Sequence, residues 1–408
     1  MRNSGRVNAH SAGPGISSND RAKGRVELSA AIHDDLCREV YCILGMPIDA
    51  IEMPEVLLRI EEAAEIASPF VISTPNLNFL VNSQVDAEFR ESLLASDLCP
   101  ADGMPIVWIA RLLGLPIERR VAGSDIFEAL KSRPHSNKPL KVFLFGVTEE
   151  VAAAAARHLN RNTDSLKCIG WICPGFGTLD ELSQQHFIDQ INSSDADFLV
   201  AALGAKKGQL WLQRNHRRLR VPIRAHLGAT INFQAGTFKR APSAMRKVGL
   251  EWLWRIKEEP TLWRRYGHDG GMLICLMLTR VLPLAIGARW LRLRASCGSH
   301  DLVIVQSQND LTVTLRLSGY ATTEQVPETI ACFRDALASG KHVELDFSAT
   351  RAIDARFFGL LLMLRKVLRS RGAIPSFVGV SPKLRRLFRL NGLLYLVSCD
   401  DQHVDIIP

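Results

Sequence analysis

Short apolar runs that end in glycine or polar residues alternate with helix-patterned stretches, and this alternation constrains the fold most. The runs read FVIST, KVFLFG, DFLVAALG and IRAHLG, and residues 151–160 carry a helical pattern between two of them. Strands that alternate with helices predict an α/β fold with a Rossmann-like open parallel sheet. Because such sheets bind ligands where strands end and helices begin, we expect a phosphate-binding cleft at that edge.

Length, cysteines and charge narrow the class of protein. A chain of 408 residues suits two domains. Its nine cysteines include no C-x-x-C pair and no secretory signal opens the chain, so we expect a reducing cytoplasmic setting. Residues 205–300 hold 19 Lys and Arg against 4 Asp and Glu, which predicts an anionic partner for this segment.

The block from Thr74 to Asp125 carries the densest set of polar and turn residues. It contains TPNLNFLVNS and, further on, ADGMPIVWIARLLGLPIERRVAGSD. This block resembles the WecG/TagA/CpsF family of bacterial glycosyltransferases, which extend sugars carried on polyprenyl diphosphate. The resemblance runs from about Pro47 to Tyr266 and includes the later strings RAHLGATINFQAGTFKRAP and GLEWLWRIKEEP.

The resemblance implies an inverting hexosyltransferase that moves a sugar from a UDP-sugar to a polyprenyl-diphosphate-linked saccharide, for exopolysaccharide or another surface glycan. Asp102 falls on the family's proposed base and Arg120 on an arginine beside the active site; without the motif, Asp102 would be a turn carboxylate. The expected substrate-binding residues are Thr74, Asn76, Gly146, Gly175, Phe176, Gly204, Gln209, Arg240, Arg255 and Arg265.

Neither a metal nor a cofactor is expected. Histidines and cysteines are scattered without ligand spacing, no Asp-x-Asp string follows an apolar strand, and arginines would stabilise the diphosphate instead. The chain also lacks G-x-G-x-x-G and P-loop strings, so the usual signatures of dinucleotide binding and ATP hydrolysis are missing.

Two departures from the family pattern leave a second function open. The family's G-x-P-K-Q-E-x-W string has Gly208 in place of its glutamine and Gln209 in place of its glutamate, and Leu262 stands where an arginine is common. Gln209 is expected to reach the space that the missing glutamine would fill. The alternative function is a non-catalytic regulator that senses nucleotide sugars.

Tryptophans and arginines alternate around an apolar run in the segment 251–298. Arg280 and Pro283 interrupt the run, so we expect an amphipathic segment at the inner surface of the cytoplasmic membrane rather than a clean span. An ordinary pair of core helices between two domains is the alternative. Nucleic acid is not expected as a partner, because no helix-turn-helix, zinc-finger or RNP string occurs.

The last hundred or so residues resemble a STAS domain, on the evidence of Gly319, LDFSATRAID and GVSPKLRRLFRLNGL. Ala355 and Arg356 follow Asp354, so no hydroxyl occupies the position of the phosphorylated serine in switchable STAS proteins. We expect a separable module that docks a protein partner and is dispensable for chemistry; a stabilising appendage is the alternative. The predicted units are a disordered tail at 1–25, a glycosyltransferase domain at 26–250, the basic appendage at 251–298 and the STAS-like domain at 299–408.

Overall fold

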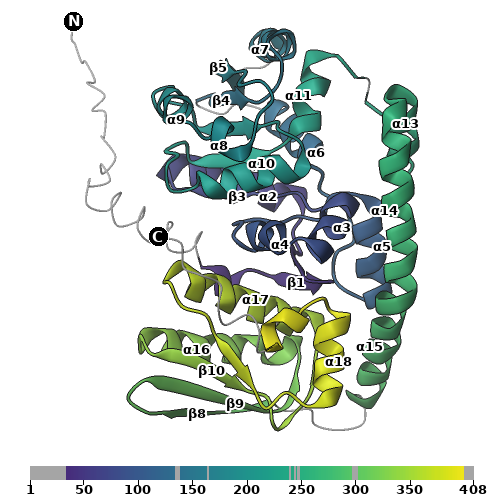
Figure 1. The fold of residues 1–408 in the computed structure, drawn as a ribbon, viewed down its shortest axis with the longest axis vertical. Helices are drawn as coiled ribbons and strands as arrows, with labels where there is room; N and C mark the ends of the chain where they lie inside the picture. The colour runs from purple at the N-terminus through teal and green to yellow at the C-terminus, as the bar shows by residue number, and fades with distance from the viewer. Residues whose placement is uncertain are drawn as a thin grey trace, which may run out of the picture.

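The computed structural model describes residues 34–133, 138–162, 165–238, 240–242, 245, 249–295 and 302–398. The tail predicted at 1–25 lies outside the described residues. Two α/β units stack end to end, and one long helical segment runs along the side of both (Figure 1). The α/β alternation predicted from the sequence is confirmed.

Five parallel strands form the sheet of the larger unit, in the order β3-β7-β6-β4-β5. Helices cover both of its faces (Figure 1), which explains why its central strands are continuous apolar runs. The four runs singled out in the sequence form β3, β4, β6 and β7. The strands are β3 Phe70–Ile72, β4 Leu140–Phe145, β5 Leu166–Ile172, β6 Phe198–Ala201 and β7 Ile223–His226.

The helices of this unit begin at strong local signals. Proline stands in the first turn of α2 and α5, and Asn76 and Asp86 cap α3 and α4 through their side-chain oxygens. The helices are α2 Met53–Ile66, α3 Leu77–Val85, α4 Ala87–Leu94, α5 Met104–Leu113, α6 Gly123–Lys131, α7 Glu149–Asn162, α8 Leu179–Leu182, α9 Gln185–Asn192, α10 Ala205–Arg214 and α11 Gly228–Ala235. The short helix η1 Asp35–Cys37 and the hairpin β1 Val40–Ile43 and β2 Met46–Asp49 precede them.

The basic segment forms one extended helical column. Its parts are α13 Glu251–Glu258, η2 Pro260–Leu262, α14 Trp263–Leu276, the π-helical turn η3 Met277–Val281 and α15 Leu282–Ala295. By length and composition alone, Pro260–Arg289 could cross a membrane. One side of the column nevertheless packs on the body of the protein: Leu276 and Val281 are buried, and Arg280 donates to Gln84 over 2.6 Å.

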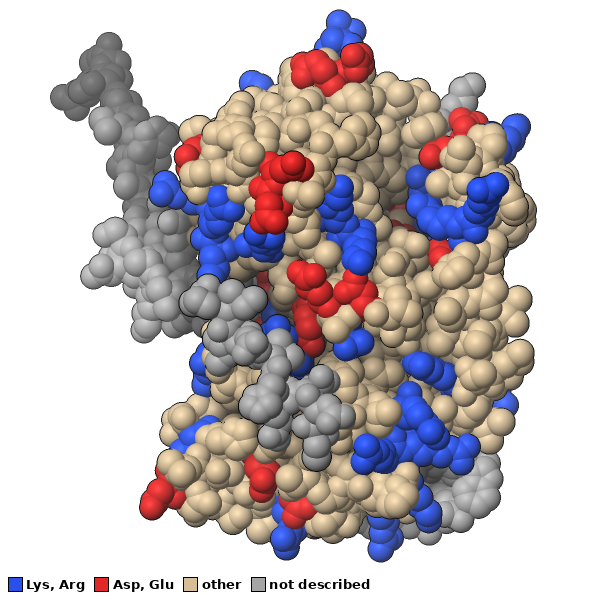
Figure 2. Space-filling view, viewed as in Figure 1, with Lys and Arg blue, Asp and Glu red and all other residues tan. Residues whose placement is uncertain are grey.

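The C-terminal unit is a second five-stranded sheet that packs against helices. β11, β9, β10 and β12 lie side by side in parallel, and β8 pairs antiparallel with β9. The elements are β8 Leu302–Gln308, β9 Thr312–Ala321, η4 Thr323–Gln325, α16 Val326–Ala338, β10 His342–Asp346, β11 Thr350–Ile353, α17 Ala355–Ser370, β12 Ser376–Val378, α18 Pro382–Leu390 and η5 Leu394–Val397. Lys and Arg side chains gather over α18 on the face shown in Figure 2.

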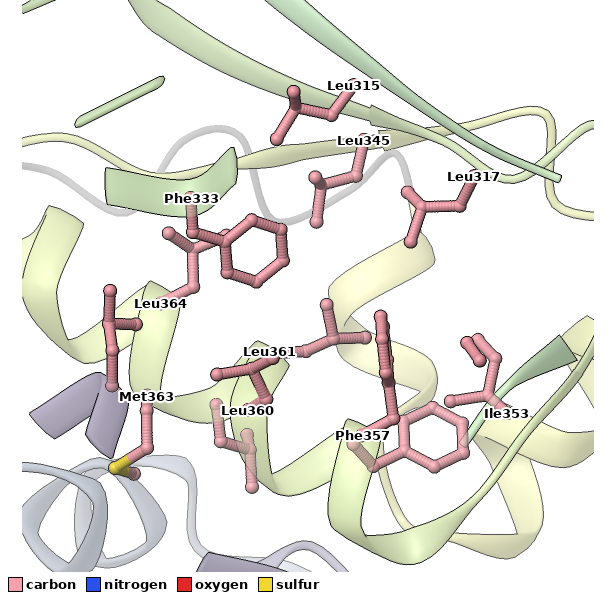
Figure 3. Close-up of a cluster of buried hydrophobic side chains, with 14 of the residues drawn as sticks. Leu315, Leu317, Phe333, Leu345, Ile353, Phe357, Leu360, Leu361, Met363 and Leu364 are labelled. Atoms are coloured by element: carbon pink, nitrogen blue, oxygen red, sulfur yellow. The ribbon is translucent and has the colours of Figure 1, made fainter. Parts of the chain in front are cut away.

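The core of the C-terminal unit continues into the larger unit. Its buried cluster (Figure 3) joins side chains of α17 and β9 to Val40 and Cys42 of β1 and Leu94 of α4. A Cβ atom at Gly359 would lie 1.9 Å from the carbonyl oxygen of Val40, so α17 sits directly on the backbone of β1. These contacts do not support the expectation of a separable STAS-like module, because its buried core includes side chains of β1 and α4.

Buried polar contacts extend this joint toward the first sheet. Lys366 of α17 donates to Asp97 over 2.9 Å and to the Ser96 carbonyl over 3.0 Å. Asp97 in turn accepts from the Val71 backbone of β3 over 2.8 Å, and the hydroxyls of Ser96 and Ser73 lie 2.7 Å apart. Ser73 directly precedes Thr74, so the C-terminal unit supports the strand end where the cleft was predicted.

The positions that correspond to a STAS phosphorylation site face this joint. Arg356 is buried and donates to the Val40 carbonyl over 3.2 Å, while Asp354 caps α17 by accepting from Phe357 over 2.8 Å. Arg365 of the same helix binds Glu91 of α4 over 2.6 Å. The start and middle of α17 are thus in contact with β1 and α4 of the same chain.

Candidate functional site

Asp102 stands at the carboxyl edge of the first sheet, held by backbone on both sides. Its N–H donates to the Pro75 carbonyl over 2.9 Å, and the Val121 N–H donates to the Ala101 carbonyl over 2.8 Å. Gly103 follows with φ +93°, a conformation that favours glycine, and begins α5. The Asp-Gly pair therefore turns the chain sharply and leaves the carboxylate of Asp102 at the end of β3.

The electrostatic setting of Asp102 suits a proton acceptor. The pKa of Asp102 is raised from 3.8 to about 7, chiefly by desolvation in the surrounding protein, and the nearby carboxylates of Glu251 and Asp125 act in the same direction. Arg120 and the backbone N–H of Gly123 act in the opposite direction. A carboxylate with a pKa near neutrality can both exist as a base and hold a proton at physiological pH.

Arg120 is the centre of an ion-pair network beside Asp102. Its guanidinium lies 3.3 Å from Asp125 and 3.0 Å from Glu251. Arg240 also binds Asp125 and donates to Ser124 over 3.0 Å. Both predicted arginines therefore reach the same carboxylate at the start of α6. Glu251 begins α13, so the network also ties the helical column to the cleft.

Thr74 and Asn76 flank the same point. Thr74 is buried, and a Cβ atom at Gly123 would lie 3.4 Å from its hydroxyl oxygen and 2.3 Å from Leu227. The end of β3, the start of α6 and the loop before α11 therefore meet closely. The Asn76 side chain accepts from the Phe79 N–H over 3.2 Å, so it caps α3 as well as bordering the cleft.

The predicted glycines follow three neighbouring strands, β4, β5 and β6. Gly146, Gly175 and Gly204 have φ values of +106°, +75° and +84°. A Cβ atom at Gly175 or Gly204 would meet open space, and Phe176 is fully exposed. Lys207 of α10 donates to the Gly177 carbonyl over 2.7 Å and fixes this loop. The glycine side of the sheet edge thus leaves room for a ligand.

Gln209 was expected to contact the substrate, but its side chain is bonded to Ser92 and Ser96 instead. It is buried, and its amide donates to the carbonyl of Ser92 in α4 over 3.1 Å and to the hydroxyl of Ser96, just after α4, over 3.3 Å. This orientation was not predictable from the sequence, because the register of α10 decides which of two adjacent residues faces α4. Its role as a substrate contact was a prediction that these contacts do not support.

His226 fills the space in front of Gly208 instead. A Cβ atom at Gly208 would lie 2.0 Å from the His226 ring. Burial lowers the pKa of His226 to about 4, so the ring is neutral, and its Nε2 atom has no hydrogen-bond partner among the described residues. Gly208 was the main argument for a non-catalytic regulator. The His226 ring thus occupies the space that a side chain at position 208 would need.

Arg255 and Arg265 lie farther along the column. Arg255 lines a small cavity together with Phe233 of α11, Phe238, Trp254, Glu258 and Glu259. Arg265 is exposed, with its guanidinium 5.2 Å from the centre of the Tyr266 ring. The role of both arginines in substrate binding stays a prediction.

Sequence reasoning missed three residues of the site: Asp125, Glu251 and His226. Asp125 and Glu251 surround Arg120 from separate elements, and His226 is visible only through its contact with Gly208. Among the described residues, no three His, Cys, Asp or Glu side chains are grouped so as to hold a metal ion.

Comparisons with known proteins identify the families to which the two units are similar. The model of the glycosyl transferase WecG/TagA/CpsF family matches residues 41–285, and that of the Mlab, STAS domain matches residues 304–398. An N-acetylglucosaminyldiphosphoundecaprenol N-acetyl-beta-D-mannosaminyltransferase of Bacillus spizizenii is 26% identical over 195 residues, 48% of this chain and 73% of the relative. The Staphylococcus aureus protein of that name is 24% identical over 228 residues, 55% of this chain and 86% of the relative.

The crystal structure of an SsGBP and GDP complex covers 63% of this chain and 97% of its own at 11% identity, but its TM-score of 0.19 is too low to carry an argument. The family match, by contrast, spans more than half of the chain and includes the whole Asp102 and Arg120 cluster. The chain therefore belongs to the WecG/TagA/CpsF family of glycosyltransferases and carries a STAS domain at its C-terminus.

Proposed function

We propose that this enzyme transfers a hexose-type sugar from a UDP-sugar to a saccharide linked to polyprenyl diphosphate, with inversion and without a metal ion. The relatives' printed names specify an N-acetylmannosaminyl group and an N-acetylglucosaminyl-diphosphoundecaprenol acceptor, which we adopt as the first substrates to test. The observation that carries the proposal is Asp102, a carboxylate of raised pKa beside Arg120 at the glycine-lined edge of the sheet.

Different residues of the site serve the acceptor and the departing diphosphate. The acceptor hydroxyl oxygen attacks the anomeric carbon while its proton passes to Asp102, and the bond from that carbon to the diphosphate oxygen breaks, so UDP leaves with the electron pair. Arg120 and Arg240 supply positive charge for the departing diphosphate. The open glycine loops and the start of α10 let phosphate oxygens approach backbone N–H groups.

We propose that His226 replaces the family's glutamine as a contact to the donor. In that case Gly208→Gln alone will weaken UDP binding at least tenfold, because the new side chain collides with the His226 ring. The double variant Gly208→Gln with His226→Gly removes the collision and regains most of the affinity. Titration calorimetry measures the UDP affinity of the wild type, the two single variants and the double variant. If the two changes in binding free energy simply add, positions 208 and 226 do not interact and the proposal is contradicted.

The exposed side of the helical column fits the surface of a membrane. Ile274, Leu278, Leu282 and Ile286 recur every four residues and are 63%, 61%, 40% and 64% exposed. Trp263 is 59% exposed beside Arg264, as expected at a lipid–water interface. Since the opposite side packs on the protein, we propose that the column lies on the inner face of the cytoplasmic membrane, where a lipid-linked acceptor resides.

Replacing the apolar stripe tests this contact. Leu278→Asp with Ile286→Asp should lower binding to lipid vesicles roughly tenfold or more, because two apolar side chains no longer enter the lipid. The matched control is Val303→Asp with Val305→Asp, which alters two exposed valines of β8, 55% and 53% accessible, away from the column. If both pairs of substitutions reduce binding to vesicles equally in a sedimentation assay, the column is not the membrane contact.

The overall proposal is tested with purified protein, radiolabelled UDP-sugars and membranes that contain lipid-linked acceptor. Label in the lipid fraction that depends on the protein supports transfer and identifies the donor. Binding of UDP without any labelled lipid, over a full panel of donors, favours the regulator instead.

A further inference from the structure

A cavity lies between the helical column and the STAS domain, away from the catalytic cleft. It has a volume of about 330 Å³, and its lining residues are Thr279, Arg280, Pro283, Arg386, Arg389 and Leu390. The column supplies one wall from η3 and α15, and α18 supplies the other. Nothing in the proposed transfer reaction uses this cavity.

The position of α18 is fixed by packing on both sides. Leu384 and Phe388 are buried in the core of the STAS domain. Leu387 and Leu390 pack against the cluster that contains Val281 of the column. The cavity is therefore formed by two elements that already hold each other in place, so a ligand would find its side chains assembled.

The charge of the cavity is positive. Three of its six lining residues are arginines, and no acidic residue lines it. Arg280 is anchored by its hydrogen bond to Gln84, whereas Arg386 and Arg389 are exposed and form no ion pair with any described residue. Both belong to α18, over which Lys and Arg side chains gather in Figure 2. Guanidinium groups arranged in this way bind phosphate oxygens well.

The apolar stripe of the column runs past the cavity. Leu278 and Leu282 of the stripe are the immediate neighbours, along the chain, of Thr279 and Pro283 in the cavity wall. The same turn of the helix therefore carries exposed apolar side chains on one side and lines the cavity on an adjacent side. A soluble phosphate compound would use the arginines but leave the stripe in water, whereas a phospholipid uses both.

We propose that this cavity binds the phosphate headgroup of an anionic membrane phospholipid, so that the STAS domain is part of the membrane-docking surface. The proposal rests on the membrane contact proposed above and specifies its lipid. Apolar contact along the stripe supplies affinity for any bilayer, and the arginines add a preference for anionic lipid. The STAS domain then contributes cations to the membrane surface instead of, or in addition to, recruiting a protein partner.

The test uses the full chain and vesicles of phosphatidylcholine alone or with about a third phosphatidylglycerol. Arg386→Glu with Arg389→Glu should reduce affinity for the anionic vesicles roughly tenfold or more and leave binding to phosphatidylcholine unchanged. Lys383→Glu with Arg385→Glu is the matched control, because it makes the same change of charge on the same helix outside the cavity. A much smaller loss is expected for it.

The outcomes separate the possible ligands. Equal losses for the two pairs show a general charge effect and overturn the cavity. Unchanged vesicle binding in the Arg386 and Arg389 pair, together with loss of glycerol phosphate binding in calorimetry, assigns the cavity to a soluble anion and also overturns the proposal. If the Leu278 and Ile286 variant retains full vesicle binding, the membrane contact itself fails, and transfer to a soluble acceptor analogue still tests the enzyme separately.

Discussion

Asp102→Asn is expected to lower the rate of sugar transfer by about a hundredfold or more while UDP binds as it does to the wild type. The amide keeps the shape of the side chain and can still accept a hydrogen bond from Gly123, but it cannot take the acceptor proton. The measurement is kcat from the initial rate of labelled lipid formation, with UDP affinity by calorimetry on the same preparations. A normal turnover rate for the variant removes Asp102 from the role of base.

The pH profile provides an independent readout of the same carboxylate. Because the pKa of Asp102 is raised to about 7, the base is protonated below that pH, and kcat/KM should fall as pH drops through about 7. An aspartate at its ordinary pKa of 3.8 would give a flat profile over that range. The dependence should disappear in Asp102→Asn, and its persistence there would assign it to another group.

Gly359→Ala is expected to destabilise the whole protein by about 3 kcal/mol. The new methyl group would lie 1.9 Å from the Val40 carbonyl oxygen, which is backbone and cannot move aside without displacing β1 from α17. The free energy of unfolding is measured by urea titration with circular dichroism. Loss of transfer should accompany the loss of stability, since Lys366 of the same helix supports Ser96 and Asp97 next to β3.

Gly267→Ala is the matched control for this change. Gly267 also lies inside a helix, α14, but a Cβ atom there meets open space, so alanine should stabilise slightly through its better helix propensity. Removal of the STAS domain tests the same joint. A chain that ends near Ser299 should be poorly soluble, because it exposes the side chains of Val40, Cys42 and Leu94 that the STAS domain buries. A soluble, active chain of that length, or a Gly359→Ala protein as stable as the wild type, would contradict the shared core.

The sequence predicted the sheet because its strands carry their own pattern, but the joint between the units depends on tertiary contacts. One indication was present: the FFGLLLMLRKV stretch of α17 is apolar nearly all round, as in a helix buried on both sides. The stretch itself does not indicate that β1 is the element that packs on its second side. The glycine in its middle is explained only by the Val40 carbonyl that approaches it.

Some residues of the site could be predicted from the sequence, and others could not. Thr74, Asp102 and Arg120 were found through the family resemblance, and the structure brings them to one edge of the sheet. The choice between Gly208 and Gln209 failed because two adjacent positions on α10 point in different directions, one toward His226 and the other toward α4. Asp125 and Glu251 are ordinary helix-start carboxylates in the sequence, and their role becomes visible only through their distances to Arg120.

The central claim is that the Asp102 cleft transfers a sugar to a lipid-linked acceptor. The most direct measurement incubates the purified full chain with UDP-N-acetylmannosamine and N-acetylglucosaminyl-diphosphoundecaprenol and identifies the lipid product by mass spectrometry, with Asp102→Asn beside it. The account predicts an acceptor enlarged by one N-acetylhexosamine with the wild type and a product reduced about a hundredfold with the variant. Equal product from both proteins, or none from the wild type with this or any other UDP-sugar, would contradict it.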